Sequence, residues 1–374
     1  MDAADSLEVL EDFDYLLSFL PSGWECQAKE LGALRRCRKV RDAKTLLRVL
    51  LIHLAEGCSL RETSARVRQG GIADLTDVAI MDRLRQAGNW FCWLNQQLMS
   101  AWVPRRPSII SGESWNVRLV DGTRVKEPGP TGSSWCVHYS IDLPSLRCRE
   151  LQVLDKHGNG ESFARFSVQE GELFVGDRAY GTPPGISHVL EAGGGVLVRF
   201  GWSLLPLWET ATERFDLFAH LRELRGTRLG DWDVTVKCGE RSWPGRVCAL
   251  RKSRQAAEAA VSKVRRAAQK HGTKTRPETL EAARYVFVFT TVDRSALKPS
   301  AVLEMYRGRW QIELVFKRLK SLIGFGHLRK KDPSGAKAWI QGKLLVALLV
   351  ETLITQGESF FPWGYPIEDV PEPM

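Results

Sequence analysis

The spacing of hydrophobic positions along the chain changes near residue 105. Before it, apolar residues recur every three or four positions, most clearly in residues 46–55, and this spacing predicts helices. Ser59 and Glu62 have the spacing of a capping box, and the helix that they open stops at Gly70-Gly71, before a further helix at residues 77–86. Two short helices around a glycine turn, flanked by arginines, indicate either a DNA-reading unit or an ordinary helical bundle.

Beyond Arg105 and Arg106 the pattern is that of strands. The first predicted strand ends at Asp121-Gly122 and the fourth at Gly176-Asp177. Three antiparallel strands followed by alternating strand and helix are the order of an α/β, RNase H-like fold. Alternating and β-branched runs predict strands at residues 117–120, 137–143, 149–154, 173–175 and 195–200, with short helices at 161–166 and 186–192.

The stretch between Asp177 and Glu313 is much longer than an RNase H-like core requires. We therefore predict a β-rich insertion at residues 202–283. We expect a hairpin around Gly239-Glu240, with strands at residues 232–237 and 246–250, and then a basic helix at 255–270. A strand at 285–290 returns to the core, and the helix that carries Glu313 starts shortly after Pro299. The predicted organisation is an N-terminal helical DNA-binding domain (1–105), a core in two parts (106–201 and 284–355), the insertion (202–283) and a Pro-rich tail (356–374).

The stretch from Tyr306 to Lys320 combines helical spacing with specific polar residues. At about 100° per residue, Tyr306, Arg309, Glu313, Lys317 and Lys320 share one sector of a helix, and apolar residues occupy the other side. The pattern predicts an amphipathic helix that holds one carboxylate among cations and a phenol. It is also compatible with a surface ladder of ion pairs, which contributes only about 0.2–0.5 kcal/mol per pair.

Asp121 and Asp177 follow strands that are neighbours in an RNase H-like sheet, so their carboxylates are expected to converge. Side by side, the two negative charges repel and require a cation between them. For either residue alone, a turn or capping role is the commoner fate of an aspartate beside glycine. Together with Glu313, three carboxylates from separate segments suit a pair of hard divalent cations, which prefer oxygen ligands.

Composition narrows the class of protein. A chain of 374 residues with 44% hydrophobic residues can bury a large core, and its formal net charge of +9 suggests a polyanionic partner, although a basic run is also compatible with a solvated face. The eight cysteines form no C-x-x-C pair, which favours reduced thiols in the cytoplasm. The N-terminus has no signal-peptide pattern, and the longest apolar run, residues 344–350, is too short to span a bilayer, so no membrane partner is expected.

Tyr306, Arg309, Glu313 and Lys320 match the signature Y-x-x-R-x-x-x-E-x-x-x-x-x-x-K. On this motif the chain resembles the DDE transposases of bacterial insertion sequences, in the insertion-sequence-four family, over roughly residues 30–365. The run from Gly176 to Tyr180, GDRAY, resembles the second-aspartate motif of that family, with alanine at position 179 where the family has glycine.

The resemblance implies that Asp121, Asp177 and Glu313 are catalytic and ligate two Mg²⁺ or Mn²⁺ ions. The reaction would be cleavage at transposon ends and transfer of the 3′-hydroxyl into target DNA, by a cut-and-paste route through a hairpinned end. The expected partners are double-stranded DNA and, in the active complex, a second copy of the chain, with the N-terminal helices on the transposon end. The expected location is the bacterial cytoplasm, at the nucleoid.

The resemblance also assigns DNA contacts outside the carboxylates. Arg309 and the lysines are expected to hold phosphates, and Tyr306 to contact a phosphate or a terminal base. An indole in the insertion holds a flipped base in the family, although a tryptophan in a hairpin usually serves packing. The expected DNA-binding residues are Tyr306, Arg309, Lys317, Lys320, Trp232 and Trp243.

Two other functions are compatible with the sequence. After Leu353 the chain becomes rich in proline, where related chains usually continue as helix, so the protein could be a truncated or domesticated transposase that binds the ends and represses. A plain RNase H-like nuclease without strand transfer is the second alternative.

Overall fold

The computed structural model describes the chain from Asp12 to Ser359 with short gaps, and it forms two compact units. The described residues are 12–35, 37, 39–101, 108–110, 113–129, 134–143, 145–155, 160–326, 328 and 332–359. The first unit comprises Met1–Val103, Arg124–Cys136 and Phe316–Met374, and the second comprises Pro104–Thr123 and Val137–Val315. The Pro-rich tail predicted for residues 356–374 starts too early, because residues 356–359 still belong to a helix that ends at Ser359. Residues 360–374 lie outside the described residues.

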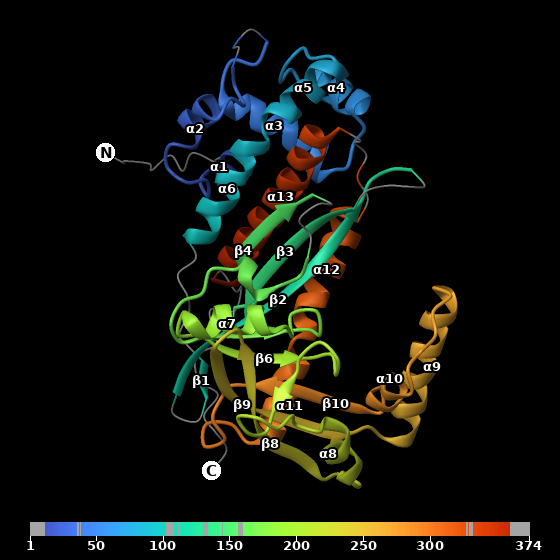
Figure 1. Ribbon diagram of the computed structural model, residues 1–374. Helices are drawn as coiled ribbons and strands as arrows, with labels where there is room; N and C mark the ends of the chain where they lie inside the picture. Colours follow the sequence, from blue (N-terminus) through green and yellow to red (C-terminus); the bar gives the residue numbers. More distant parts are fainter. Residues whose placement is uncertain are drawn as a thin grey trace. The chain divides into compact units, whose positions relative to one another are not determined.

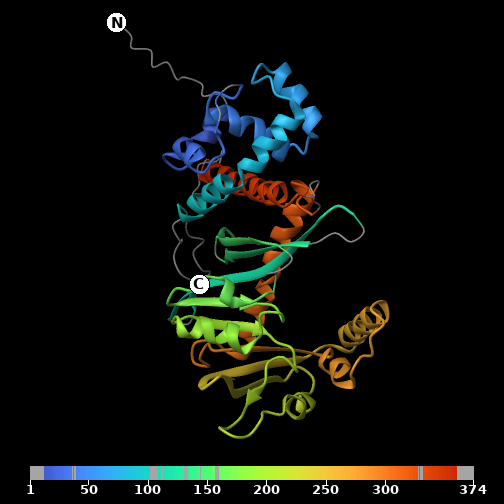
Figure 2. The ribbon, with the colours of Figure 1, turned by 45° about the horizontal axis from the view of Figure 1, so that its top comes forward.

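The first unit is helical (Figure 2). Its long helix α13 (Pro333–Ser359) packs against three of the N-terminal helices, α3, α5 and α6. The approach is close, because a Cβ on Gly342 would lie 2.4 Å from Leu54 Cδ1. The N-terminal helices are α1 (Asp12–Leu17), α2 (Trp24–Glu30), α3 (Ala43–Ala55), α4 (Leu60–Gln69), α5 (Asp77–Gln86) and α6 (Gly88–Ser100).

By length and composition alone, α13 could cross a bilayer over Pro333–Gln356, with a mean hydropathy of 1.5. This apolar stretch is longer than the run of residues 344–350 noted in the sequence. However, 67% of its most apolar window is buried within the protein, largely against the other helices of the unit. Its hydrophobic residues therefore serve as the core of a helical unit.

The helix pair α4 and α5 carries the arginines that suggested DNA reading. The predicted cap is confirmed, since the Ser59 hydroxyl accepts a hydrogen bond from the Glu62 amide at 3.1 Å. Each of the three arginines of α4 lies in an ion pair with a nearby carboxylate, Arg61 with Asp77, Arg66 with Glu56 and Glu62, and Arg68 with Asp74. These arginines thus already have acidic partners within the unit.

The second unit is built on a mixed sheet in the order β4-β3-β2-β5-β6-β10-β9-β8-β7, with β1 beside β2 (Figure 1). β2 pairs with β5, and β5 with β6, in parallel, whereas β10, β9 and β8 continue antiparallel. The strands are β1 (Ser108–Ile110), β2 (Glu113–Lys126), β3 (Ser134–Asp142), β4 (Cys148–Leu154), β5 (Glu172–Gly176), β6 (Gly195–Arg199), β7 (Leu207–Trp208), β8 (Leu229–Cys238), β9 (Arg241–Arg251) and β10 (Tyr285–Thr290).

Side chains alternate between two faces of this sheet. On one face Phe174, Val198 and Phe289 join a buried cluster with residues of the short helices η1 (Phe163–Arg165), α7 (Pro183–Glu191) and α8 (Leu217–Glu223). The opposite face packs against α11 (Pro299–Gly308), which contacts β6, β8, β9 and β10. α12 (Trp310–Leu322) follows α11, and α9 (Arg254–Lys270) and α10 (Pro277–Ala282) lie between β9 and β10 in sequence.

The hairpin expected around Gly239-Glu240 is confirmed as β8 and β9, and its position in the fold is informative. β10 pairs with β9 along its whole length, from Tyr285↔Arg251 to Thr290↔Arg246, so the hairpin extends the main sheet. The basic helix and the returning strand are confirmed as α9 and β10. The expected helix at residues 161–166 is only the 3₁₀ turn η1.

Two local predictions were wrong. The strand expected to end at Asp121 continues as β2 to Lys126, because β3 remains its neighbour after the pairs with β5 stop at Leu119. The single helix expected across Tyr306 to Lys320 is two helices, since α11 ends at Gly308 and α12 begins at Trp310. Glycine is a poor helix former, and the Ile312 amide bonds back only three residues to the Arg309 carbonyl at 3.2 Å.

Arg118 on β2 connects the strands of the sheet to each other through buried charges. Its guanidinium donates to Glu172 at 3.0 Å, to Glu150 at 3.0 Å and to the Ser140 hydroxyl at 2.9 Å. The Arg118 and Glu172 side chains are only 3% and 2% exposed, so neither charge has access to bulk water. Separating or removing one partner of such a buried ion pair leaves the other charge without compensation, which is strongly destabilising. The pair therefore favours the observed arrangement of the strands.

Replacing Arg118 with Met should therefore lower the free energy of unfolding by about 3–5 kcal/mol, measured by urea denaturation. The matched control is Arg222→Met, which removes an exposed arginine paired with Glu281 and should change stability little. Equal effects of the two substitutions would show that Arg118 does not organise the sheet.

Candidate active site

The register of β2 and β5 brings Asp121 and Asp177 to the same level of the sheet. Leu119 pairs with Val175 in the parallel ladder, and each aspartate lies two residues further along, Asp121 within β2 and Asp177 directly after β5. Both carboxylates therefore lie on the face that α11 covers, and the charge of Asp177 acts on Asp121. Two aspartates 56 positions apart in the sequence are thus close enough for their charges to interact.

Both aspartates are held by backbone amides. Asp121 Oδ1 accepts from the Gly122 amide at 2.8 Å, and Asp177 Oδ1 accepts from the Ala179 amide at 2.8 Å. Among the described residues only Leu146 combines a side chain with positive φ. Ala179 therefore fits its turn without strain, and the alanine in place of the family's glycine leaves the geometry of Asp177 intact.

Arg309, at the junction of α11 and α12, links the third acidic residue to the first. Its guanidinium lies 3.4 Å from Asp121 Oδ2 and forms an ion pair with Glu313 one turn further along. Arg309 and Asp121 are largely buried, with side chains 15% and 16% exposed, whereas Glu313 is 57% exposed. The guanidinium is thus shared between two carboxylates that belong to different segments.

The electrostatics of Asp121 reflect its surroundings. Burial, reinforced by the charges of Asp177 and Glu161, raises the pKa of Asp121 to about 7, against the lowering effects of the Gly122 amide and Arg309. Burial also raises the pKa of Tyr306, although Arg309 and Arg199 oppose it. A carboxyl group this reluctant to ionise gains from any additional positive charge nearby.

Arg199 is a part of the site that the sequence did not reveal. Gly176 pairs with Val198, so Arg199 at the end of β6 is level with Asp177, on the same face. Its charge reaches Tyr306 on α11. A lone arginine at a strand end has no distinctive sequence signal, and only the register shows its neighbours.

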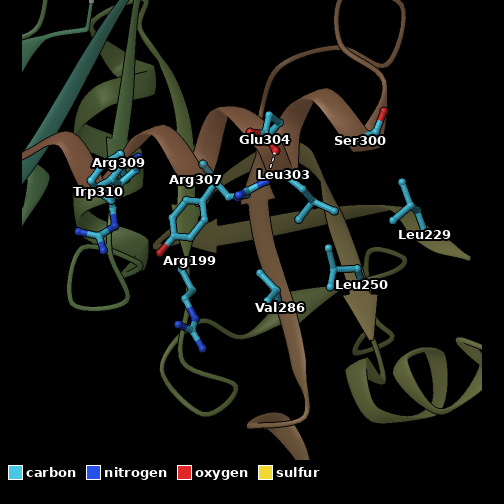
Figure 3. Close-up of a pocket in the computed structure, with 11 residues that line it drawn as sticks. Arg199, Leu229, Leu250, Val286, Ser300, Leu303, Glu304, Arg307, Arg309 and Trp310 are labelled. Carbon is cyan, nitrogen blue, oxygen red and sulfur yellow. Dashed lines mark hydrogen bonds and ion pairs between the residues drawn. The ribbon is translucent and has the colours of Figure 1, made fainter. Parts of the chain in front are cut away.

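A cavity of about 420 Å³ adjoins Tyr306 and Arg309 (Figure 3). Its floor is apolar, formed by side chains of β8, β9, β10 and α11, and its charged residues are Arg199, Arg307, Arg309 and Glu304. Figure 3 shows Arg309 and Trp310 together at one end of α11, where the indole is 52% exposed. The apolar lining consists of Leu229, Leu250, Val286 and Leu303.

The other predicted DNA-binding residues are not among those that line this cavity. Trp232 packs against Phe215 and His220, and a Cβ on Gly230 would overlap its ring. Trp243 donates from Nε1 to the Ser187 hydroxyl at 3.0 Å. Lys317 and Lys320 are exposed on the part of α12 that belongs to the first unit.

The residues present suit a hard divalent cation in chemistry, because carboxylate oxygens are its preferred ligands and Asp121 and Asp177 repel each other. Within the described part of the chain, no three side chains of His, Cys, Asp or Glu already converge at metal-binding distance. Glu313 is instead turned toward Arg309. A change of partner at Glu313 would be needed for all three carboxylates to ligate together.

Comparisons with known proteins show similarity over most of the chain. A family model described as the transposase DDE domain matches residues 159–349, which include Asp177 and Glu313 and begin after Asp121. The chain is 35% identical over 352 residues to the putative transposase InsL for insertion sequence element IS186A of Escherichia coli strain K12, covering 91% of this chain and 93% of the relative. The transposase for insertion sequence element IS421 of Escherichia coli is likewise 35% identical over 353 residues, with the same coverage.

The raised pKa of Asp121 predicts a specific pH dependence of stability. Below pH about 4 the carboxyl group is protonated in both the folded and the unfolded chain, so it has no effect. As the pH rises to about 7 only the unfolded chain loses the proton, and the folded state is progressively destabilised. Above pH 7 the full cost of ~4 kcal/mol is present, at about 1.4 kcal/mol per pKa unit.

Asp121→Asn should therefore be more stable than the wild-type protein at pH 8 and equal to it near pH 4. The measurement is urea unfolding of both proteins at pH 4, 6 and 8, with a chelator in every buffer. A stability difference that stays constant across this range would contradict the assignment.

Proposed function

The chain belongs to the DDE transposases of bacterial insertion sequences, metal-dependent enzymes that act on DNA, and we propose that it cleaves transposon ends and joins them to target DNA. Asp121, Asp177 and Glu313 are its metal-ligating carboxylates. The observation that carries the proposal is the level register of Asp121 on β2 and Asp177 directly after the parallel β5, with Arg309 between Asp121 and Glu313.

The sheet order supports an RNase H-like reading of the core. β4, β3 and β2 are neighbours at one side, followed by β5 and β6, with α7 between the last two in sequence. In such a core the first aspartate lies on the first strand, and the second follows the fourth strand. If the short β1 is not counted, β2 is the first strand and β5 the fourth. Asp121 on β2 and Asp177 after β5 then occupy these two positions. The β8–β9 hairpin with α9 is then the insertion.

Two Mg²⁺ or Mn²⁺ ions, when bound by these carboxylates, would activate the attacking oxygen and stabilise the leaving oxygen in an in-line displacement at phosphorus. The chain's own contribution is to hold the three carboxylates and to keep Asp121 away from bulk water. The mutual repulsion of Asp121 and Asp177 fits this role, since it disfavours the two charges together unless a cation is near.

The cationic residues would position the DNA. Arg309 and Arg199 lie beside the aspartates on the face covered by α11 and can offer planar, bidentate contacts to phosphate. Lys317 and Lys320 extend the positive charge along α12 as point charges, and Tyr306 adds a phenol hydroxyl. A phosphate that draws Arg309 away from Glu313 would leave that carboxylate available for a metal ion.

The cavity beside Tyr306 suits an unstacked base. It is apolar at its floor, cationic at its edge, and carries the exposed indole of Trp310. Bases stack on aromatic side chains with about 1–3 kcal/mol each. The proposal thus transfers the role first expected for Trp232 or Trp243, which are occupied by packing and a hydrogen bond, to Trp310.

Further parts of the proposal concern the whole reaction. We place the N-terminal helices on the transposon end and a second copy of the chain in the active complex, and we favour cut-and-paste excision through a hairpinned end. α9 exposes Lys263, Arg265, Arg266 and Lys270 and stands out from the sheet in Figure 1, as a phosphate-binding element would. Since its substrate is DNA, the protein acts in the bacterial cytoplasm, and association with the nucleoid remains a prediction.

Glu313→Gln should abolish cleavage and strand transfer while leaving binding to end-bearing DNA unchanged, because the amide keeps the shape but loses the negative charge that a cation requires. Cleavage is measured on labelled end DNA with Mg²⁺, transfer by joining to a plasmid, and binding by gel shift. Glu223→Gln is the matched control, since Glu223 is an exposed glutamate of α8 that does not line the cavity.

The same assays separate the alternatives. A repressor derived from a transposase would shift the DNA without cutting it, and a plain nuclease would cut without joining ends to the plasmid. Full cleavage by Glu313→Gln would refute the assignment of the carboxylates.

Trp310→Ala should reduce end cleavage by about tenfold, through the loss of base stacking. With 2-aminopurine at successive positions near the end, the wild-type protein should raise the fluorescence at one position, where the base leaves the helix stack. The variant should lower that rise, whereas Trp232→Ala and Trp243→Ala should retain it. Loss of the signal in Trp243→Ala alone would return the role to the insertion.

A further inference from the structure

A fourth carboxylate lies against the backbone beside Asp121. Gly122 has no side chain, and a Cβ built on it would lie 2.8 Å from Glu161 Oε1 and 3.4 Å from its Cδ. The carboxylate of Glu161 therefore rests on the glycine that directly follows the first aspartate. Its negative charge also acts on Asp121, alongside that of Asp177.

The segment that carries Glu161 is fixed on both sides. Phe163, two residues later, is fully buried and contacts the rings of Phe174 and Tyr180. The Ser162 hydroxyl caps η1 by accepting from the Ala164 amide at 3.2 Å, and Arg165 Nε donates to the Gly160 carbonyl at 2.5 Å. The carboxylate thus reaches Gly122 from an anchored turn, and Tyr180, part of the anchor, lies three positions after Asp177.

We propose that Glu161 is a further carboxylate of the divalent-cation site, acting beside Asp121. The inference rests on the proposed function, since it extends the same site by one residue. Carboxylates that lie close together at a partly buried position repel each other. A cation bound between them removes this repulsion, so the group of carboxylates favours cation binding. The bare glycine at position 122 is what allows the carboxylate to come this near.

Sequence reasoning had no means of finding Glu161. It lies 40 positions after Asp121 in a turn, outside any strand or long helix, and it is not part of the signature that suggested the family. An acidic residue before a short helix is normally an exposed or capping residue. The position becomes meaningful only because Glu161 lies against Gly122 of β2.

The test measures Mn²⁺ binding to the metal-free protein by electron paramagnetic resonance, without DNA and without turnover. Glu161→Gln should weaken Mn²⁺ binding by about tenfold, the lower end of the effect that residues supporting a metal site usually have. Glu223→Gln, the same substitution at an exposed position of α8, should bind Mn²⁺ as the wild type does. The Mg²⁺ concentration for half-maximal end cleavage should rise in parallel in Glu161→Gln.

Two further variants make the outcome decisive. Gly122→Ala should also weaken Mn²⁺ binding, because the new methyl group displaces the Glu161 carboxylate, and circular dichroism verifies that each variant is folded. If Asp121→Asn loses Mn²⁺ binding while Glu161→Gln keeps wild-type affinity, this inference is overturned and the proposed function stands. If Asp121→Asn itself binds Mn²⁺ normally, the proposed catalytic site is wrong.

Discussion

The pairing of β2 with β5 is the constraint on which the site depends. In a parallel pair, residues that are equally far along from a paired position lie level with each other. The pair Leu119↔Val175 therefore sets the level of Asp121 and Asp177, each two residues further along. A shift of one residue would turn one aspartate to the opposite face, into the cluster around Phe174 and Val198. The buried Arg118, which bonds to Glu172 on β5 and Glu150 on β4, opposes such a shift from inside the sheet.

The insertion hairpin contributes to the same site through α11. Arg246 on β9 is almost fully buried, forms two 3.0 Å contacts with Asp231 on β8, and donates to the carbonyls of Val292 and Leu297. Those carbonyls belong to the loop that leads into α11, the helix of Tyr306. The hairpin is therefore a structural support for the residues around the cavity, because it fixes where α11 starts over the sheet.

The sequence predicted the parts of this arrangement that have a local cause. Strand alternation located β10 and the hairpin. Asp177 does follow the end of β5, whereas Asp121 lies within β2, which continues to Lys126. Arg199 and Glu161 could not be predicted, because the role of each depends on its neighbour in space, Asp177 for Arg199 and Gly122 for Glu161. Those neighbours follow from strand register and tertiary packing, which leave no local pattern in the sequence. The helix break at Gly308 was missed because the polar residues on both sides of it keep the 100° spacing of one continuous helix. That spacing does not register the low helix propensity of a single glycine.

The position of Arg309 follows from competition among its partners. Burial opposes any charge at this point, yet the guanidinium remains between Asp121 and Glu313 because two carboxylates offset the lost hydration. A DNA phosphate would compete with the two carboxylates for the guanidinium. A divalent cation would compete with the guanidinium for the two carboxylates. A phosphate that binds Arg309 would release the carboxylates for a cation, and a cation that binds the carboxylates would release Arg309 for a phosphate. Binding of DNA and of metal should therefore be mutually favourable at this site.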